Sequence, residues 1–180
     1  MATATHPTTK KSSSKKTSTK TAASKSSAKT PSAIKLLKDD HREVEDLFSQ
    51  YQKARSDARK TELVRKICLA LKVHTQIEEE YFYPASREFV KSEDIVDEAI
   101  VEHASAKELI AQLEAGEVGD ELYDAKVTVL CEMIEHHVEE EEKEYFPQVQ
   151  KSDMDLEAIG TRMAERKKEL MAQLGGEAKH

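Results

Sequence analysis

The feature that most constrains the fold is a helical spacing of apolar residues, found in four stretches that each include a histidine. Apolar residues three and four positions apart share one face of an α-helix, so each stretch is expected to bury that face. The histidines on these faces are His41, His74, His103 and His137. A histidine that recurs on four buried faces indicates one shared site rather than four separate core residues.

The four stretches are joined by short segments, which favour neighbouring antiparallel helices. They cover roughly residues 32–56, 60–89, 93–115 and 120–149. The expected fold is therefore all-α, an up-down-up-down antiparallel four-helix bundle. The composition supports this class, because glycine (5 residues) and proline (4 residues) are scarce and charged residues make up 35% of the chain, as is typical of amphipathic helices.

A change of composition divides the chain into three parts. They are a disordered tail rich in Lys, Ser, Thr and Ala at 1–31, the bundle at 32–150, and a short C-terminal helix with its own tail at 151–180. Residues 1–30 contain seven lysines and no acid, and are too polar to form a core. The C-terminal helix is expected from Asp155 to about Leu174, ended by Gly175 and Gly176.

The basic tail could contact a nucleic acid, because lysines that neutralise phosphates release counterions. It lacks the aromatic residues that stack on bases, and a solubilising extension is the alternative. No apolar run approaches the roughly 18 residues of a membrane span, and the N-terminus lacks the hydrophobic segment of a secretory signal. Two cysteines make no disulfide framework. We expect a cytoplasmic protein without a membrane partner, with both cysteines in the core.

The second half of the bundle repeats the first. Two helical hairpins of one design can pack about a pseudo-two-fold axis, which would bring both copies of an inward motif together. The matched residues are Asp40-His41 with Glu102-His103 at an offset of 62, and Cys68, His74, Glu78, Glu79 and Pro84 with Cys131, His137, Glu141, Glu142 and Pro147 at an offset of 63.

Two glutamates complete the pattern, because each follows a histidine by four residues and so shares its helix face. Two buried carboxylates without compensation would cost several kcal/mol or take up protons, whereas a pair of cations would offset them. Nitrogen and oxygen ligands without a thiolate suit iron, manganese or zinc. The candidate metal ligands are His41, His74, Glu78, His103, His137 and Glu141.

The expected centre holds two metal ions bridged by Glu78 and Glu141, since a carboxylate can bridge two cations while an imidazole is normally terminal. Six protein groups around two ions leave coordination positions open, which favours a reactive or ligand-binding centre. The pseudo-symmetry assigns His41 and His74 to one ion, and His103 and His137 to the other.

This constellation resembles the hemerythrin-like (HHE cation-binding) family over about residues 32–150. The resemblance implies a non-haem centre of two carboxylate-bridged iron ions, oxygen or nitric-oxide binding, and iron or redox sensing; manganese and zinc are the alternative metals. The motifs that carry it are Asp40-His41, His74-Thr-Gln-Ile-Glu78-Glu-Glu-Tyr-Phe-Tyr-Pro84, Glu102-His103 and His137-Val-Glu-Glu-Glu141-Glu-Lys-Glu-Tyr-Phe-Pro147.

The sequence departs from the respiratory hemerythrins at two points. Where they have a second histidine one turn after the first on the third helix, this chain has Lys107. Where they have an aspartate five residues after the last histidine, this chain has Glu141 after four. These departures favour oxygen sensing, peroxide or nitric-oxide chemistry, or iron handling over reversible oxygen carriage. An iron-oxidising or peroxide-consuming enzyme and a DNA-associated protein are the alternatives.

A neighbouring histidine competes with one of the chosen ligands. His136 has the same spacing to a glutamate as His137, but only His137 precedes Pro147 by ten residues, as the matching histidine and proline do in the first half. The acidic run 139–144 is otherwise expected to be a solvated face.

A ferritin-like site would need a glutamate three residues before a helical histidine, and no such glutamate is present.

Glu45 lies one turn after His41 and is a possible extra ligand, although the matching position in the second half is Lys107. Asp40 and Glu102 precede their histidines directly. They either orient ligands from outside the metal centre or are ordinary surface acids.

Overall fold

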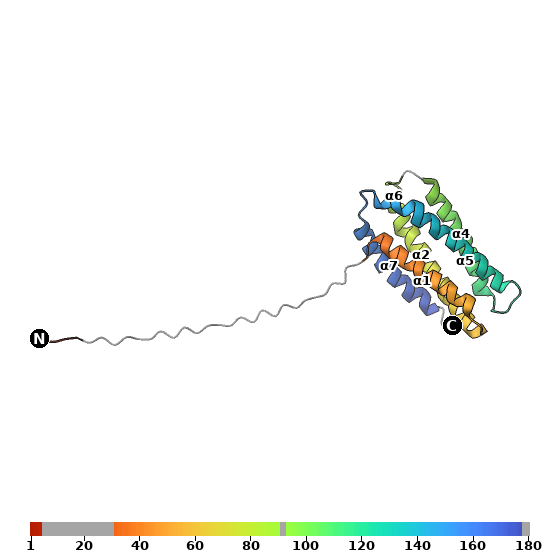
Figure 1. Cartoon of the computed structure of the whole chain (residues 1–180), viewed down its shortest axis with the longest axis horizontal. Helices are drawn as coiled ribbons and strands as arrows, with labels where there is room; N and C mark the ends of the chain where they lie inside the picture. The colour runs from red at the N-terminus through yellow and green to blue at the C-terminus, as the bar shows by residue number, and fades with distance from the viewer. Residues whose placement is uncertain (5–30, 91–92, 178–180) are drawn as a thin grey trace.

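The computed structural model describes residues 1–4, 31–90 and 93–177. Within these ranges all regular structure is helical, which confirms the all-α class, and none of the described helices is long and apolar enough to cross a membrane. The predicted tail falls largely on residues 5–30, outside the described residues. The long helices pack alongside one another (Figure 1) and are α1 (Ala33–Lys53), α2 (Asp57–Ile77), α4 (Glu93–Ala115), α5 (Tyr123–Glu140) and α7 (Leu156–Glu177).

Two helix ends differ from the sequence prediction. α2 begins three residues early because Ser56 caps it, its hydroxyl accepting a hydrogen bond from the amide of Arg59 at 3.4 Å. α7 continues to Glu177, so the predicted end before Gly175 is wrong. A glycine costs only about 1 kcal/mol inside a helix, and α7 packs on α2 here, where a Cβ on Gly175 would lie 3.7 Å from Leu69.

The second and fourth predicted helices are each interrupted by a wider π-helical turn that starts at a candidate metal ligand. Each turn leads into a short helix that contains a proline. A proline has no amide hydrogen and clashes with the carbonyl four residues earlier, so regular α-helical hydrogen bonding cannot continue through it. The elements are η1 (Glu78–Phe82) with α3 (Tyr83–Ser86), and η2 (Glu141–Tyr145) with α6 (Phe146–Gln150).

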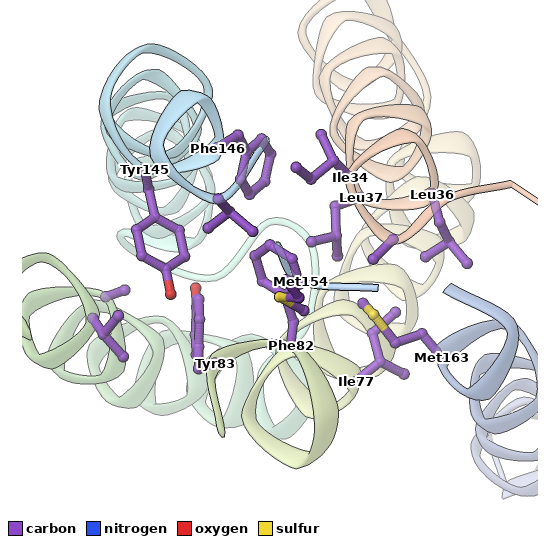
Figure 2. Close-up of a cluster of buried hydrophobic side chains, with 14 of the residues drawn as sticks. Ile34, Leu36, Leu37, Ile77, Phe82, Tyr83, Tyr145, Phe146, Met154 and Met163 are labelled. Carbon is purple, nitrogen blue, oxygen red and sulfur yellow. The ribbon is translucent and has the colours of Figure 1, made fainter. Parts of the chain in front are cut away.

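Buried apolar side chains form two clusters, and the buried polar residues fall between them. On α1, for example, His41 lies between Leu37 of the first cluster and Val44 of the second. Burial of one such side chain contributes about 1.5–3 kcal/mol, so the clusters fix the helices on both sides of the polar layer. The first cluster (Figure 2) includes Phe82, Tyr83, Tyr145, Phe146 and Met163. The second includes Phe48, Ile67, Leu71, Ile110 and Leu130.

The C-terminal helix α7 packs against α1 and α2 and buries Met163 and Leu170. Its close approach to the start of α1 depends on Gly160. A Cβ at this position would lie 2.4 Å from the carbonyl oxygen of Pro31 and 2.6 Å from the amide nitrogen of Ala33. Neither backbone atom can move without shifting α1, so this crossing requires glycine.

Gly160→Ala is expected to lower the free energy of unfolding by about 1–3 kcal/mol, the usual cost of overpacking. Urea unfolding of the two proteins measures the difference. Gly176→Ala is the matched control, because a Cβ there meets nothing within 4 Å and a helical alanine is preferred over glycine by about 1 kcal/mol. Equal stability of Gly160→Ala and wild type would contradict the close packing of α7.

Candidate metal site

The structure brings all six predicted side chains together between the two apolar clusters. Glu78 is completely buried and each of the other five is at most 5% exposed. Each long helix of the predicted bundle contributes a histidine, and the glutamates begin the two π turns. The converging residues are His41 (α1), His74 (α2), Glu78 (η1), His103 (α4), His137 (α5) and Glu141 (η2).

Glu78 faces one histidine from each half of the repeat. Its Oε2 lies 3.1 Å from Nε2 of His74 and 3.5 Å from Nε2 of His103. An oxygen between two imidazole nitrogens from different halves has the position required of a carboxylate shared by two cations. Glu78 accordingly belongs to both of the buried groups of side chains that could hold a metal ion.

Glu141 is placed in the related way. Its Oε2 lies 3.3 Å from Nε2 of His41 and 3.7 Å from Nε2 of His137. The Nε2 atoms of His103 and His137 are 3.2 Å apart, so these two imidazoles face a common point. One buried group contains His41, His74, Glu78 and Glu141, and the other contains Glu78, His103 and His137.

Six buried polar atoms of the site lack hydrogen-bond partners, which tests whether a metal fits. Buried polar groups are normally hydrogen-bonded, and leaving them unpaired costs about 1–3 kcal/mol each, more for charged groups. Cations at the common points would face the Nε2 and carboxylate oxygen atoms among them, and such mixed donors suit iron, manganese or zinc. The unpartnered atoms are His41 Nε2, His74 Nδ1 and Nε2, Glu78 Oε1 and Oε2, and Glu141 Oε2.

Two glutamates orient histidines from outside this centre. Nδ1 of His41 lies 2.9 Å from Oε1 of Glu142, and Nδ1 of His103 lies 2.9 Å from Oε1 of Glu79. A carboxylate that accepts from Nδ1–H leaves Nε2 free to face a metal. Glu142 was expected on a solvated face and Glu79 had no predicted role. Their shared place in the repeat was the signal that could have identified them.

Asp40 and Glu102 act on the other two histidines. Oε2 of Glu102 lies 2.8 Å from Nδ1 of His137, and Oδ2 of Asp40 lies 3.5 Å from Nδ1 of His74. Of the two sequence interpretations, the structure supports the orienting role. Every histidine of the centre therefore has Nε2 directed inward and Nδ1 directed at a carboxylate.

Lys107 does more than replace a histidine ligand. Its Nζ donates to both oxygens of Glu79, at 2.6 and 2.7 Å. Hydrogen bonds from His103 and Lys107 outweigh burial and lower the pKa of Glu79 to about 2. Glu79 is therefore ionised at neutral pH, as an acceptor for His103 must be.

Tyr83 makes the two halves of the site different. Its buried hydroxyl donates to Oε1 of Glu141 at 2.9 Å, and Figure 2 shows it directed into the interior beside Tyr145. Burial and the nearby carboxylates raise its pKa well above the usual value, so the hydroxyl keeps its proton. The matching residue in the other half is Phe146, which stacks on His41 with a ring separation of 5.9 Å.

Tyr83→Phe is expected to retain the metals and change their electronic spectrum, because Glu141 loses a hydrogen bond while all six candidate ligands remain. The free energy of unfolding of the metal-free protein should fall by about 1.5–3 kcal/mol, the usual contribution of a hydrogen bond to a charged group. Tyr145→Phe is the control, since that hydroxyl contacts Ser86 instead, at 2.5 Å. An unchanged spectrum in Tyr83→Phe would show that this hydroxyl does not influence the centre.

The competing residues lie outside the centre. Glu45 pairs with Arg42 at 2.9 Å, and its side chain is 40% exposed. The His136 side chain is 64% exposed, with Nε2 3.5 Å from Glu140 and 3.8 Å from Glu102. His136 therefore belongs to a surface group of side chains, and His137 is the one that points inward.

The two cysteines are free and buried, in agreement with their interpretation as core residues. Burial is the main cause that raises the pKa of both Cys68 and Cys131 to about 12. Both thiols are therefore protonated at neutral pH, which makes them poor nucleophiles and poor metal ligands.

Comparison with known proteins points to one family. The profile of the Hemerythrin HHE cation binding domain matches residues 32–149. A DNA nickase from Nostoc sp. is 27% identical over 145 residues, which cover 79% of this chain but only 41% of the relative. The crystal structure of a Hemerythrin HHE cation binding domain-containing protein from Mycobacterium kansasii shares the fold, with a TM-score of 0.68, 22% identity, and coverage of 79% of this chain and 89% of that one. This chain is a member of the hemerythrin HHE cation-binding domain family.

Proposed function

We propose that this protein binds two iron ions and uses them to bind or sense oxygen, nitric oxide or an oxidant. The observation that carries the proposal is the convergence of six buried donor side chains, four of which (His41, His74, Glu78 and Glu141) have atoms without a hydrogen-bond partner. The proposal includes the up-down-up-down order of the bundle, because that order lets both hairpins face the same centre. The proposed ligands are His41, His74, Glu78, His103, His137 and Glu141, with Glu78 and Glu141 as bridges.

The space beside the histidines favours a small ligand. A cavity of about 10 Å³ adjoins all four of them and is walled by apolar side chains. Such a volume holds about one water-sized molecule, which suits a diatomic gas or a peroxide rather than an organic substrate. The apolar residues of the wall are Val44, Leu71, Ile134 and Val138.

The protein groups have separate tasks in this proposal. When bound, a pair of iron ions supplies electrons and open coordination positions. The four outer carboxylates hold the imidazoles in one tautomer, and the apolar wall limits the entry of water. Tyr83 provides a proton donor fixed by its hydrogen bond to Glu141.

Iron content and the response to ligand test the proposal together. Protein purified from its own host should contain two irons per chain. After anaerobic reduction, its near-ultraviolet and visible spectrum should change on exposure to oxygen or nitric oxide. His136→Ala is a matched control that should behave like wild type, since that side chain is 64% exposed. Two bound irons without any spectral change would contradict the ligand-binding role.

The same preparation distinguishes the enzymatic alternative. A sensor or binding protein reacts with oxidant once, in a fixed stoichiometry per chain, and then stops. An iron-oxidising or peroxide-consuming enzyme would consume many equivalents of Fe(II) or peroxide per chain, which a stopped-flow assay with excess substrate would detect.

Contact with a nucleic acid is a second candidate function. Residues 1–30 carry seven lysines and no acid, and the Nostoc relative is named a DNA nickase. Binding of the full chain to duplex DNA should weaken as salt rises, because counterion release drives it. A chain that lacks residues 1–30 should lose this binding. Equal binding by both chains would contradict a role for the tail.

A further inference from the structure

The C-terminal helix α7 lies beyond the family match, which ends at residue 149, yet it packs beside the elements that carry the candidate metal ligands. It packs on α1, on α2 and on the π turn η1. In Figure 2 its residue Met163 lies beside Ile77, next to the turn that carries Glu78. Helix α7 is therefore in position to influence one particular part of the centre.

One contact runs from α7 through Asp40 to a proposed ligand. Nζ of Lys167 donates to Oδ1 of Asp40, whose other oxygen faces Nδ1 of His74 at 3.5 Å. Asp40 is only 6% exposed, so its charge needs a nearby cation. Lys167 supplies that cation and fixes the carboxylate that orients His74.

Two further cations of α7 hold the turn that begins at Glu78. The guanidinium of Arg166 donates to both oxygens of Glu80, at 2.7 and 3.0 Å. A two-point contact of this kind fixes direction as well as distance. The guanidinium of Arg162 lies 4.8 Å from the ring centre of Tyr81, a cation–π contact.

The second half of the repeat lacks these attachment points. The residues that match Glu80 and Tyr81 at the offset of 63 are Lys143 and Glu144. Lys143 would repel a guanidinium group, and Glu144 has no aromatic ring for a cation–π contact. Lys143 instead pairs with Glu139 on the surface. Of the side chains that α7 contacts, Glu80 and Tyr81 thus have no equivalent in the second half, whereas Asp40 is matched by Glu102.

We propose that α7 is a positioning element that makes the metal position of His41 and His74 the tighter of the two. Lys167 holds Asp40 behind His74, and Arg166 holds the η1 turn that carries Glu78. Both residues act through others and touch no metal themselves. This inference rests on the proposed two-metal centre.

Anaerobic titration of the metal-free full chain with Co(II) tests the inference, because the visible bands of Co(II) report each position separately. Wild type should take up two equivalents in two steps. Lys167→Met should weaken the tighter step by about tenfold, the lower range for groups that orient metal ligands, and should alter its bands while the other step is unchanged. Lys167→Arg, which keeps the positive charge, should titrate as wild type does.

Lys168→Met is the matched control, because it removes the same charge from an exposed position of the same helix and should leave both steps unchanged. Arg166→Gln should repeat the effect of Lys167→Met. Wild-type steps in Lys167→Met, or equal weakening of both steps, would overturn the role of α7. Fewer than two equivalents bound by wild type would instead overturn the two-metal proposal itself.

Discussion

Glu78→Gln is expected to abolish tight binding of the metal pair while the metal-free fold keeps its stability. Glu78 is the carboxylate that both buried groups of side chains share, and an amide carries no charge to bridge two cations. Loss of a bridging ligand should weaken binding by at least the roughly 100-fold seen for groups outside a metal centre. Once Glu78 is neutral, His74 can release its proton, so no uncompensated charge is left. The free energy of unfolding should therefore stay within about 1 kcal/mol of wild type.

Anaerobic Fe(II) titration and urea unfolding in chelator measure the two parts of this prediction. Glu139→Gln is the control, because that side chain is 60% exposed and pairs with Lys143. It should bind two ions as wild type does. Wild-type iron affinity in Glu78→Gln would remove Glu78 from the centre, and unfolding of the metal-free variant would show that the charge is structural.

Metal loading is expected to stabilise the fold, and the gain should grow as the pH rises above about 6.5. Burial lowers the pKa of His74, but Glu78 and Asp40 outweigh it and raise that pKa to about 10. Because this value exceeds the unfolded value of 6.5, protonated His74 stabilises the metal-free fold below pH 6.5. That contribution is lost as the pH rises toward 10. A metal needs the deprotonated nitrogen, so its binding tightens over the same interval.

The stability of the chain with chelator and with Mn(II) at about pH 6 and about pH 8.5 gives this gain. A free metal concentration of 100 times Kd contributes about 2.7 kcal/mol per site. Two occupied sites should therefore raise the urea concentration at the midpoint of unfolding. A metal-induced gain that is equal at both pH values would contradict the coupling to His74.

The sequence was sufficient to predict the helices and to select the six residues that converge. Helical spacing places a side chain on a face, and the repeat chose His137 over His136 where spacing alone was ambiguous. The same repeat also relates Glu79 to Glu142. Their role was missed because an acidic residue that orients a histidine and one that faces solvent look alike in a sequence.

Other features depend on packing between distant segments and leave little local signal. The prolines after the π turns indicate that the helices are interrupted, but they do not show that a wider turn begins at Glu78 and at Glu141. The residues that flank Gly160 in the sequence do not indicate that it packs against the backbone at the start of α1. The contact of Lys167 with Asp40 joins residues 127 positions apart, and no helical periodicity encodes such a pairing.

The central claim is that two cations lie between the histidine pairs and share Glu78 and Glu141. Anomalous diffraction at the iron absorption edge from crystals of the iron-loaded full chain tests it most directly. Two peaks about 3.5–4 Å apart, the spacing of paired catalytic metals, are predicted. One should adjoin His41 and His74, and the other His103 and His137. A single peak, or peaks beside the exposed His136, would contradict the account.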